Sequence, residues 1–244
     1  MKKVLCLLLT ILLCLSTCSA MVFAEEVSAF PDVSTSSVNY EAIEKMKELG
    51  YINGYEDGTF KPDKLVTRAE FVKVLVEQKG GVGNIPDGTL TGFYDVDTYT
   101  RHWAYKYIYA GVQSGYINGM GDGTFMPDAT ITYEQALAIL IRFSGKEDSA
   151  KFAVNSFTPL WPNAYIITGE RLEMHTNTGL SKGMPVSRKH MAQMVHNTLN
   201  TLKNNIVVPG GGGISTGGGD GNVREDNIEY KNVTGVLYQQ QESA

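Results

Sequence analysis

Two short loops hold the side chains with the clearest capacity for chemistry. Residues 53–58, Asn-Gly-Tyr-Glu-Asp-Gly, place oxygen atoms at the spacing that begins an EF-hand calcium loop. Such a loop needs a bidentate Glu at its twelfth position. The chain has Lys64 there, and Ala129 at the matching place in the second loop, which begins at Asn118. We therefore predict no calcium site, and no other metal site.

The sequence also lacks an arrangement of residues typical of a catalytic site. The histidines lack the His-Glu-x-x-His spacing of a zinc helix, so we expect them on the solvated surface; they are His102, His175, His190 and His196. The three cysteines, Cys6, Cys14 and Cys18, all lie in the first 24 residues. We expect no enzymatic activity and no cofactor.

Composition and charge narrow the class of partner. The chain has 244 residues, of which 43% are hydrophobic and 19% charged, so it can bury a core. Its formal net charge is −5 and it has no stretch rich in Lys or Arg. Because nucleic-acid binding depends on neutralising phosphates with such residues, nucleic acid is excluded as a partner.

The first 24 residues have the pattern of a secretory signal peptide. Lys2 and Lys3 precede an apolar run from Val4 to Leu15, and small residues lead to Ala24. We predict cleavage after Ala24, which leaves an exported protein without thiols, disulfides or a membrane segment. An uncleaved anchor and lipidation at Cys18 remain the alternatives.

An internal repeat organises the rest of the chain. Residues 50–75 and 115–140 share 13 identities over 26 positions at an offset of 65, which marks modules that bury their faces on one another. A Phe-x-Asp-Val segment precedes each copy, beginning at Phe30 and Phe93. A third, divergent copy has Leu180 where the second has Phe125, and it lacks the Asp-Gly-Thr-Phe loop.

Each copy predicts a helix, a compact loop and a second helix. The first helix should end at Gly50 or Gly115, because glycine tolerates the positive φ of a helix C-terminus. Capping boxes predict where the second helix starts, with Thr67 and Glu70 in the first copy and Thr132 and Gln135 in the second. Ser187 should cap the third without a box partner, because His190 stands at that position.

These elements predict an all-α fold of three packed modules. We place a signal peptide at 1–24 and modules at 25–85, 86–147 and 148–203. A Gly-rich linker should follow at 204–222, because glycine-rich segments form flexible chain. Residues 223–244 are too few to build a core and form either a disordered tail or the start of a further domain.

The motifs Phe-x-Asp-Val, Trp103-Ala104, Gly-Tyr-Ile-Asn-Gly, Asp-Gly-Thr-Phe-x-Pro and Thr67-Arg68-Ala69-Glu70 resemble the S-layer homology (SLH) domain family over roughly residues 28–202. The resemblance implies three tandem SLH modules in a pseudo-threefold, three-pronged bundle. It also implies noncovalent attachment of an exported protein to secondary cell-wall polysaccharide in the wall of a bacterium, typically Gram-positive. In that family the usual target is a pyruvylated sugar.

Arg68 is the natural partner for the carboxylate of such a sugar. A guanidinium holds a carboxylate with two parallel hydrogen bonds, and free backbone N–H groups at the helix start should favour the same anion. The second copy has Tyr133 instead, which can stack on a sugar but cannot pair a carboxylate. The third copy keeps Arg188 without its own Asp-Gly-Thr-Phe loop. We predict at most two charge-reading sites, at Arg68 and Arg188.

Other residues have two interpretations each. Asp57 and Gly58, with nearby Gly54, contact sugar hydroxyls or only form a turn, and so does Asp122-Gly123. Asp32 and Asp95 bind ligand or cap the first helix. Trp103 and Trp161 stack on sugar or pack in the core, and burial is the expectation for both.

Two functions from different classes remain open. The chain is a module that binds an acidic cell-wall glycan, or it is a surface-assembly protein whose repeats mainly contact other surface-layer subunits. Binding to isolated cell walls before and after removal of pyruvate separates the two.

Overall fold

The computed structural model describes residues 28–98, 101–152 and 160–204. The predicted signal peptide, nearly all of the Gly-rich linker and the tail lie outside these residues. The described residues form helices and no strand, which confirms the all-α prediction. No helix among them is long and apolar enough to cross a membrane.

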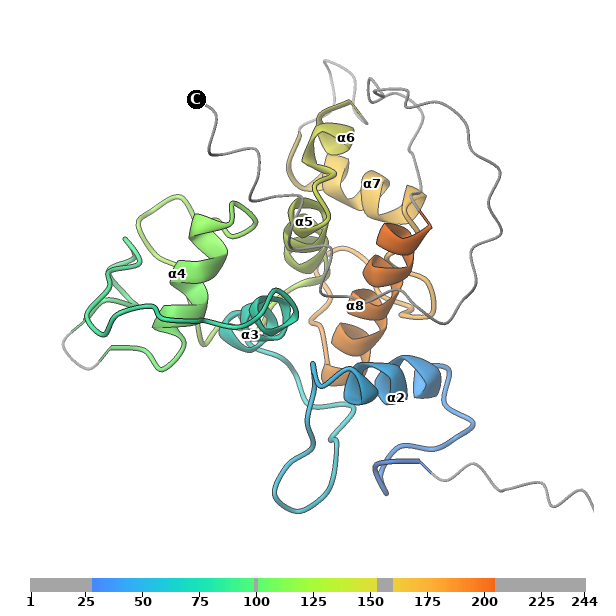
Figure 1. The fold of residues 1–244 in the computed structure, drawn as a ribbon. Helices are drawn as coiled ribbons and strands as arrows, with labels where there is room; N and C mark the ends of the chain where they lie inside the picture. Colours follow the sequence, from blue (N-terminus) through green and yellow to red (C-terminus); the bar gives the residue numbers. More distant parts are fainter. Residues whose placement is uncertain (1–27, 99–100, 153–159, 205–244) are drawn as a thin grey trace, which may run out of the picture.

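The helices follow the order of the repeats (Figure 1). The first repeat contains α2 (Tyr40–Glu48) and α3 (Arg68–Gln78), and the second contains α4 (Tyr105–Gln113) and α5 (Tyr133–Phe143). The third region is less regular, with α6 (Glu147–Phe152), η1 (Leu160–Ala164), α7 (Tyr165–Arg171) and the long α8 (Arg188–Lys203). The second helix of each repeat therefore starts directly after the predicted cap residue.

The helices pack in pairs drawn from different repeats. α3 packs against α4, α5 against α7, and α2 against α8, and Figure 1 shows α3 and α4 to the left of the other helices. α3 thus finds its main helical partner in the second repeat, and α5 finds its partner in the region of the predicted third module. α2 and α8 join the first repeat to that region. A single repeat is therefore not a packing unit by itself.

Three backbone segments, one from each of the three regions, are joined in a closed cycle of hydrogen bonds. The N–H of Val66 donates to Val186 O, that of Ile131 to Val66 O, and that of Val186 to Ile131 O, each at 3.0 Å. All three side chains are buried. Three isolated bridges, Leu65 with Ser187, Thr67 with Thr130, and Thr132 with Pro185, extend the cycle. A threefold arrangement requires such a cycle, while the three-pronged outline itself stays a prediction.

The loops are anchored by the aromatic residues of the repeat. Phe60 and Phe125 are fully buried, and their rings lie 5.2 Å from Phe30 and 5.6 Å from Phe93. Leu180, which replaces them in the third copy, is only half-buried. The third loop therefore has a less buried residue at this position than the other two loops.

Both tryptophans were expected in the core, and this expectation is wrong. Trp103 is 53% exposed and Trp161 is 49% exposed. The buried face of α4 runs through Ile108 and Gly111, and Trp103 lies before the helix, outside that stripe. It packs sideways against His102 and Tyr107 instead.

Candidate functional site

Arg68 reaches out of its own repeat into the loop of the second. Its Nε donates to Phe125 O at 2.8 Å and its Nη2 to Asn118 O at 3.4 Å. The guanidinium lies 4.6 Å from the centre of the Phe125 ring. We call this set of residues the Arg68 site. The loop carbonyls that bind the arginine thus lie 50 and 57 residues further along the chain.

Burial governs the chemistry of this guanidinium. Arg68 is only 4% exposed, and burial lowers its pKa to about 10, an effect that nearby Asp95 opposes. The group therefore stays protonated at neutral pH. Within the described residues it has no carboxylate at ion-pair distance. A buried cation without a counter-ion suits an external anion, but its low exposure restricts access.

Arg188 repeats the arrangement with the loop of the first repeat. Its Nε donates to Phe60 O at 2.7 Å and its Nη2 to Asn53 O at 2.8 Å. The guanidinium lies 4.6 Å from the Phe60 ring and 4.9 Å from the Tyr55 ring. We call this set the Arg188 site. Arg188 is half-buried, and no acidic side chain of the described ranges pairs with it.

This geometry corrects the interpretation of the third copy. We expected Arg188 to lack a surrounding loop because its own copy has no Asp-Gly-Thr-Phe segment. The loop is supplied by the first repeat instead, since α8 starts beside it when the cycle of repeats closes (Figure 1). The degenerate third loop meets the second repeat, where Tyr133 N–H donates to Met184 O at 2.9 Å.

Tyr133 itself does not offer a stacking surface. It is 1% exposed and belongs to the core, and burial raises its pKa to about 12. The expectation that its ring stacks on a sugar is therefore wrong. An aromatic residue follows the helix cap here because it fills the core beneath the third loop.

The helix starts offer fewer free donors than the sequence indicated. Arg68 N–H donates to Ala129 O at 2.9 Å, and Arg188 N–H donates to Lys64 O at 2.9 Å. The following N–H groups, of Ala69 and Lys189, bind Pro127 O and Pro62 O. The expectation of free N–H groups for an anion is thus wrong for these positions. The guanidinium side chains are the remaining cationic donors.

The capping residues are mostly as predicted. In the first repeat Glu70 N–H donates to Thr67 Oγ1 at 3.2 Å and Thr67 N–H donates to Glu70 Oε2 at 2.9 Å. In the second, Thr132 N–H donates to Gln135 Oε1 at 3.3 Å. The two side chains adopt the capping-box arrangement, but the Thr132 hydroxyl makes no hydrogen bond of good geometry.

His190 completes a capping box that we predicted to be absent. Its Nδ1 accepts from Ser187 N–H at 3.4 Å and lies 3.1 Å from Ser187 Oγ. A neutral imidazole nitrogen is an acceptor and replaces the Glu or Gln of the other repeats. Burial is the main cause that lowers the pKa of His190, with a smaller contribution from neighbouring Lys189.

Asp32 and Asp95 tie loop backbones in place. The two oxygens of Asp32 accept from Phe60 N–H and Lys61 N–H, both at 2.7 Å. Asp95 accepts in the same way from Phe125 N–H at 2.9 Å and Met126 N–H at 2.7 Å. The N-caps of α2 and α4 are Asn39 and Ala104, so the capping interpretation is wrong for both aspartates.

The Asp-Gly turns are held by their own side chains. Asp57 Oδ1 accepts from the N–H and hydroxyl of Thr59, and these bonds keep the pKa of Asp57 well below its usual range. Asp122 does the same with Thr124. A Cβ on Gly54 would lie 2.7 Å from the Phe30 ring, and Gly58 has φ +77°. Turn and packing requirements thus account for these residues, whose sugar contacts stay predictions.

The surroundings of the two arginines differ in charge. Two lysines that we add to the Arg188 site are Lys61 and Lys64, whose ammonium groups lie 4.2 and 5.0 Å from the Tyr55 ring. At an offset of 65 the second loop has Met126, Ala129 and Met120 in place of Lys61, Lys64 and Tyr55. The repeat alignment could have shown this difference, but not which arginine each loop meets.

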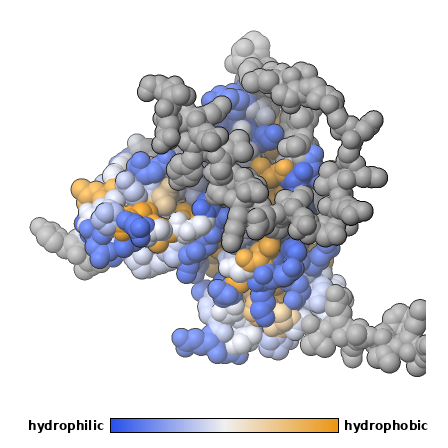
Figure 2. Space-filling view, viewed as in Figure 1, coloured by the Kyte–Doolittle hydropathy of each residue, from blue (hydrophilic) through white to orange (hydrophobic). Residues whose placement is uncertain are grey.

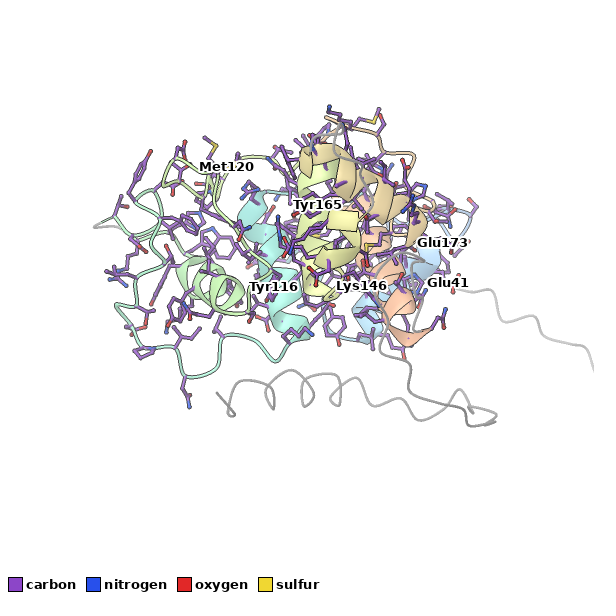
Figure 3. The ribbon with its side chains drawn as sticks, turned by 90° about the horizontal axis from the view of Figure 1, so that it is seen from above. Glu41, Tyr116, Met120, Lys146, Tyr165 and Glu173 are labelled. Carbon is purple, nitrogen blue, oxygen red and sulfur yellow. The ribbon has the colours of Figure 1, made fainter. Side chains whose placement is uncertain are left out.

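Exposed apolar side chains gather at the second loop. Tyr94 is 65% exposed, Met120 42% and Met126 43%. Figure 2 shows apolar residues on the surface of the lobe formed by α3, α4 and their loops. In Figure 3 Met120 lies on the loop that follows α4, away from the pair of α5 and α7. The surface near Arg68 is therefore apolar where the surface near Arg188 is cationic.

Trp103 belongs to neither arginine site. Its ring neighbours are His102, Tyr107 and the ammonium group of Lys73, which lies 5.9 Å from its ring. It is exposed and stands beside the pair of α3 and α4. A sugar contact at Trp103 stays a prediction separate from the two sites.

The histidines are half-buried rather than solvated, which corrects the expectation for His102, His175, His190 and His196. His102 lies 3.1 Å from Asp128, an arrangement that fixes the second loop. Burial lowers the pKa of His196. No group of three or more potential metal ligands occurs within the described part of the chain.

Several known proteins are similar to this chain over part of their length. The chain is 40% identical over 117 residues to the cellulosome-anchoring protein of Acetivibrio thermocellus, covering 46% of this chain and 25% of that protein. It is 24% identical over 211 residues to the surface layer protein of Brevibacillus choshinensis, covering 85% and 17%. An endoglucanase of Bacillus sp. is 34% identical over 147 residues, covering 58% and 15%.

The chain therefore spans a quarter or less of the length of these relatives. The S-layer homology domain matches residues 29–72 and 92–137, and this match does not extend to residues 148–203, where the third module stays a prediction. The two matched segments fall inside the first two predicted modules, and each of them is thus similar to the S-layer homology domain.

Proposed function

We propose that this chain holds an exported protein at the surface of a bacterium, typically Gram-positive, by binding an acidic secondary cell-wall polysaccharide without a covalent bond. The ligand group we propose is a pyruvate ketal, which places a permanent carboxylate on a sugar. The names of the relatives, an anchoring protein and a surface layer protein, support the cellular role.

The observation that carries the proposal is the guanidinium of Arg188. Two of its five N–H groups donate to loop carbonyls, and its side chain is half-exposed without an acidic partner among the described residues. The carbonyl bonds fix the plane of the group, and the remaining N–H groups can donate to a carboxylate. The partly exposed ring of Tyr55, 4.9 Å from the guanidinium, adds a surface on which a sugar can pack.

Arg68 is the second proposed contact and the weaker one. It has the same pair of carbonyl acceptors, but it is almost fully buried. An anion gains most from a cation that it can reach without first opening the protein. We therefore assign the main charge contact to Arg188 and a supporting contact to Arg68.

Cosedimentation with isolated cell walls tests the proposal. The full chain should pellet with untreated walls and remain in solution with walls from which pyruvate has been removed. Arg188→Ala should weaken binding by about tenfold or more, the scale of a lost charge-assisted contact. Arg188→Lys, which keeps the charge but not the planar fork, should fall between the two, and circular dichroism should show all variants folded.

A second function has some support in the exposed apolar residues of the second loop, which suit contacts with other protein subunits. In that case the repeats would mainly assemble a surface layer. Equal binding to untreated and depyruvylated walls, with no effect of Arg188→Ala, would favour this alternative. Neither function involves catalysis by the described residues.

A further inference from the structure

We infer that the Arg188 site recognises two negative charges on neighbouring sugars, whereas the Arg68 site recognises no more than one. This inference rests on the proposed function, because it specifies the ligand of the same site. The Arg188 site has three cationic side chains within 5.0 Å of the Tyr55 ring centre, those of Arg188, Lys61 and Lys64. No two of these charges can lie more than about 10 Å apart.

That separation is comparable to the Debye length of about 8–10 Å at physiological ionic strength. The three charges therefore act on a bound anion together rather than as independent points. A single carboxylate is satisfied by the planar fork of Arg188 alone. The two lysines leave a second cationic position beside the Tyr55 ring, which a second anionic group can occupy.

The lysines have partners in the free protein, but these partners are weak. Lys61 pairs with Asp57 at 2.9 Å, and both side chains are about half exposed. Lys64 lies 3.7 Å from Glu70 and donates to the Tyr55 hydroxyl at 2.8 Å. Exposed pairs of this kind open readily in water. A ligand anion can therefore replace Asp57 or Glu70 beside a lysine.

The second loop provides the comparison within the same molecule. Lys61 has φ 57° and Met126, at the same place in the repeat, has φ 54°. The two loops also make the same backbone turn, in which Lys64 N–H donates to Lys61 O at 3.1 Å and Ala129 N–H donates to Met126 O at 3.2 Å. Methionine and alanine replace the lysines in the second loop. Lys61→Met with Lys64→Ala therefore gives the first loop the side chains that the second loop already carries in that conformation.

Three matched disaccharides test the inference by calorimetry at low and physiological salt: one neutral, one with a single pyruvate ketal, and one with a ketal on each sugar. We expect the full chain to bind the doubly charged compound about tenfold or more tightly than the singly charged one. The Lys61→Met, Lys64→Ala variant should lose this preference and bind the singly and doubly charged compounds within about threefold of each other.

Two controls separate the effect of the lysines at this site from the effect of the net charge of the protein. Lys106→Met with Lys151→Ala removes two positive charges from α4 and α6 and should keep the preference. Lys61→Arg with Lys64→Arg should also keep it. A variant without the lysines that still prefers two charges overturns the inference alone. Equal binding of the neutral and acidic disaccharides by the unmodified chain overturns the proposed function itself.

Discussion

The Arg68 and Arg188 sites are built from the same parts and differ in access and charge. In each, an arginine at the start of a helix donates to two carbonyls of a loop from another repeat and lies over a buried phenylalanine. Arg68 is almost fully buried and its loop carries exposed methionines, whereas Arg188 is half-exposed and lies near two lysines. The carbonyl bonds and the phenylalanine ring, which both sites share, therefore have a structural role. The exposure of the arginine and the charges near it, which differ, can distinguish ligands.

The comparison also shows why an arginine of this kind has two roles. Its carbonyl bonds join one repeat to the next and so contribute to the closed cycle. Its remaining N–H groups are free to bind an anion only where the side chain is exposed. Arg68 thus serves mainly the fold, and Arg188 serves both the fold and the proposed binding.

The largest expected effect comes from removing the ring beneath one arginine. Phe60→Ala should lower the free energy of unfolding by about 3–5 kcal/mol, because Phe60 is fully buried. It should also abolish wall binding through Arg188, and Phe125→Ala should destabilise equally while affecting only Arg68. Chemical denaturation with parallel cosedimentation measures both effects. A Phe60→Ala protein that binds walls normally would contradict the assignment of the main site.

A smaller effect should follow from freeing one loop. Asp32→Ala removes two charge-assisted bonds to loop N–H groups and should cost about 1.5–3 kcal/mol of stability. Asp95→Ala should cost a similar amount at the other loop. Only Asp32→Ala should weaken wall binding, since its loop contains the Arg188 acceptors. Equal losses of binding in both variants would show that the two sites contribute equally.

Arg68→Ala should separate stability from binding. Loss of its bonds to Phe125 O and Asn118 O should lower stability by about 1–3 kcal/mol. Wall binding should fall only about two- to threefold, because the buried guanidinium is hard for a ligand to reach. Thermal unfolding and cosedimentation of one preparation measure the two quantities. Arg68 would be the principal contact if its loss weakened binding more than Arg188→Ala does.

The smallest expected effect is a dependence of stability and wall binding on pH, caused by His190 in the helix that carries Arg188. Because burial lowers the pKa of His190 in the folded protein, its contribution to stability is complete above the unfolded pKa of about 6.5. The contribution is lost as the pH falls from there through the lower folded pKa, since a protonated Nδ1 cannot accept from Ser187 N–H. Wall binding should therefore weaken slightly between pH 7 and pH 5.

His190→Gln provides the matched variant, since Gln135 has this role in the second repeat. It should reduce the pH dependence of unfolding and of binding relative to the unmodified chain. His196, whose pKa is also lowered, is present in both proteins and cancels in the difference. Identical pH profiles of the two proteins would exclude His190 as the source.

The local features of this protein were determined by its sequence. Helix starts at Thr67 and Thr132, turns at Gly50 and Gly115, and the burial of Phe60 follow from capping, φ preference and spacing, which act within a few residues. The role of His190 was missed because a neutral imidazole can accept as a carboxylate does. The exposure of Trp103 was missed because it stands one residue outside the buried stripe.

The tertiary structure alone decided which loop meets which arginine. Arg188 binds carbonyls 128 and 135 residues earlier in the chain, and nothing in its own repeat indicates them. Backbone carbonyls accept regardless of the side chain they carry, so such contacts leave no signature in residue type. They follow only from the closure of the cycle at Val66, Ile131 and Val186, where packing across repeats fixes the register of the whole molecule.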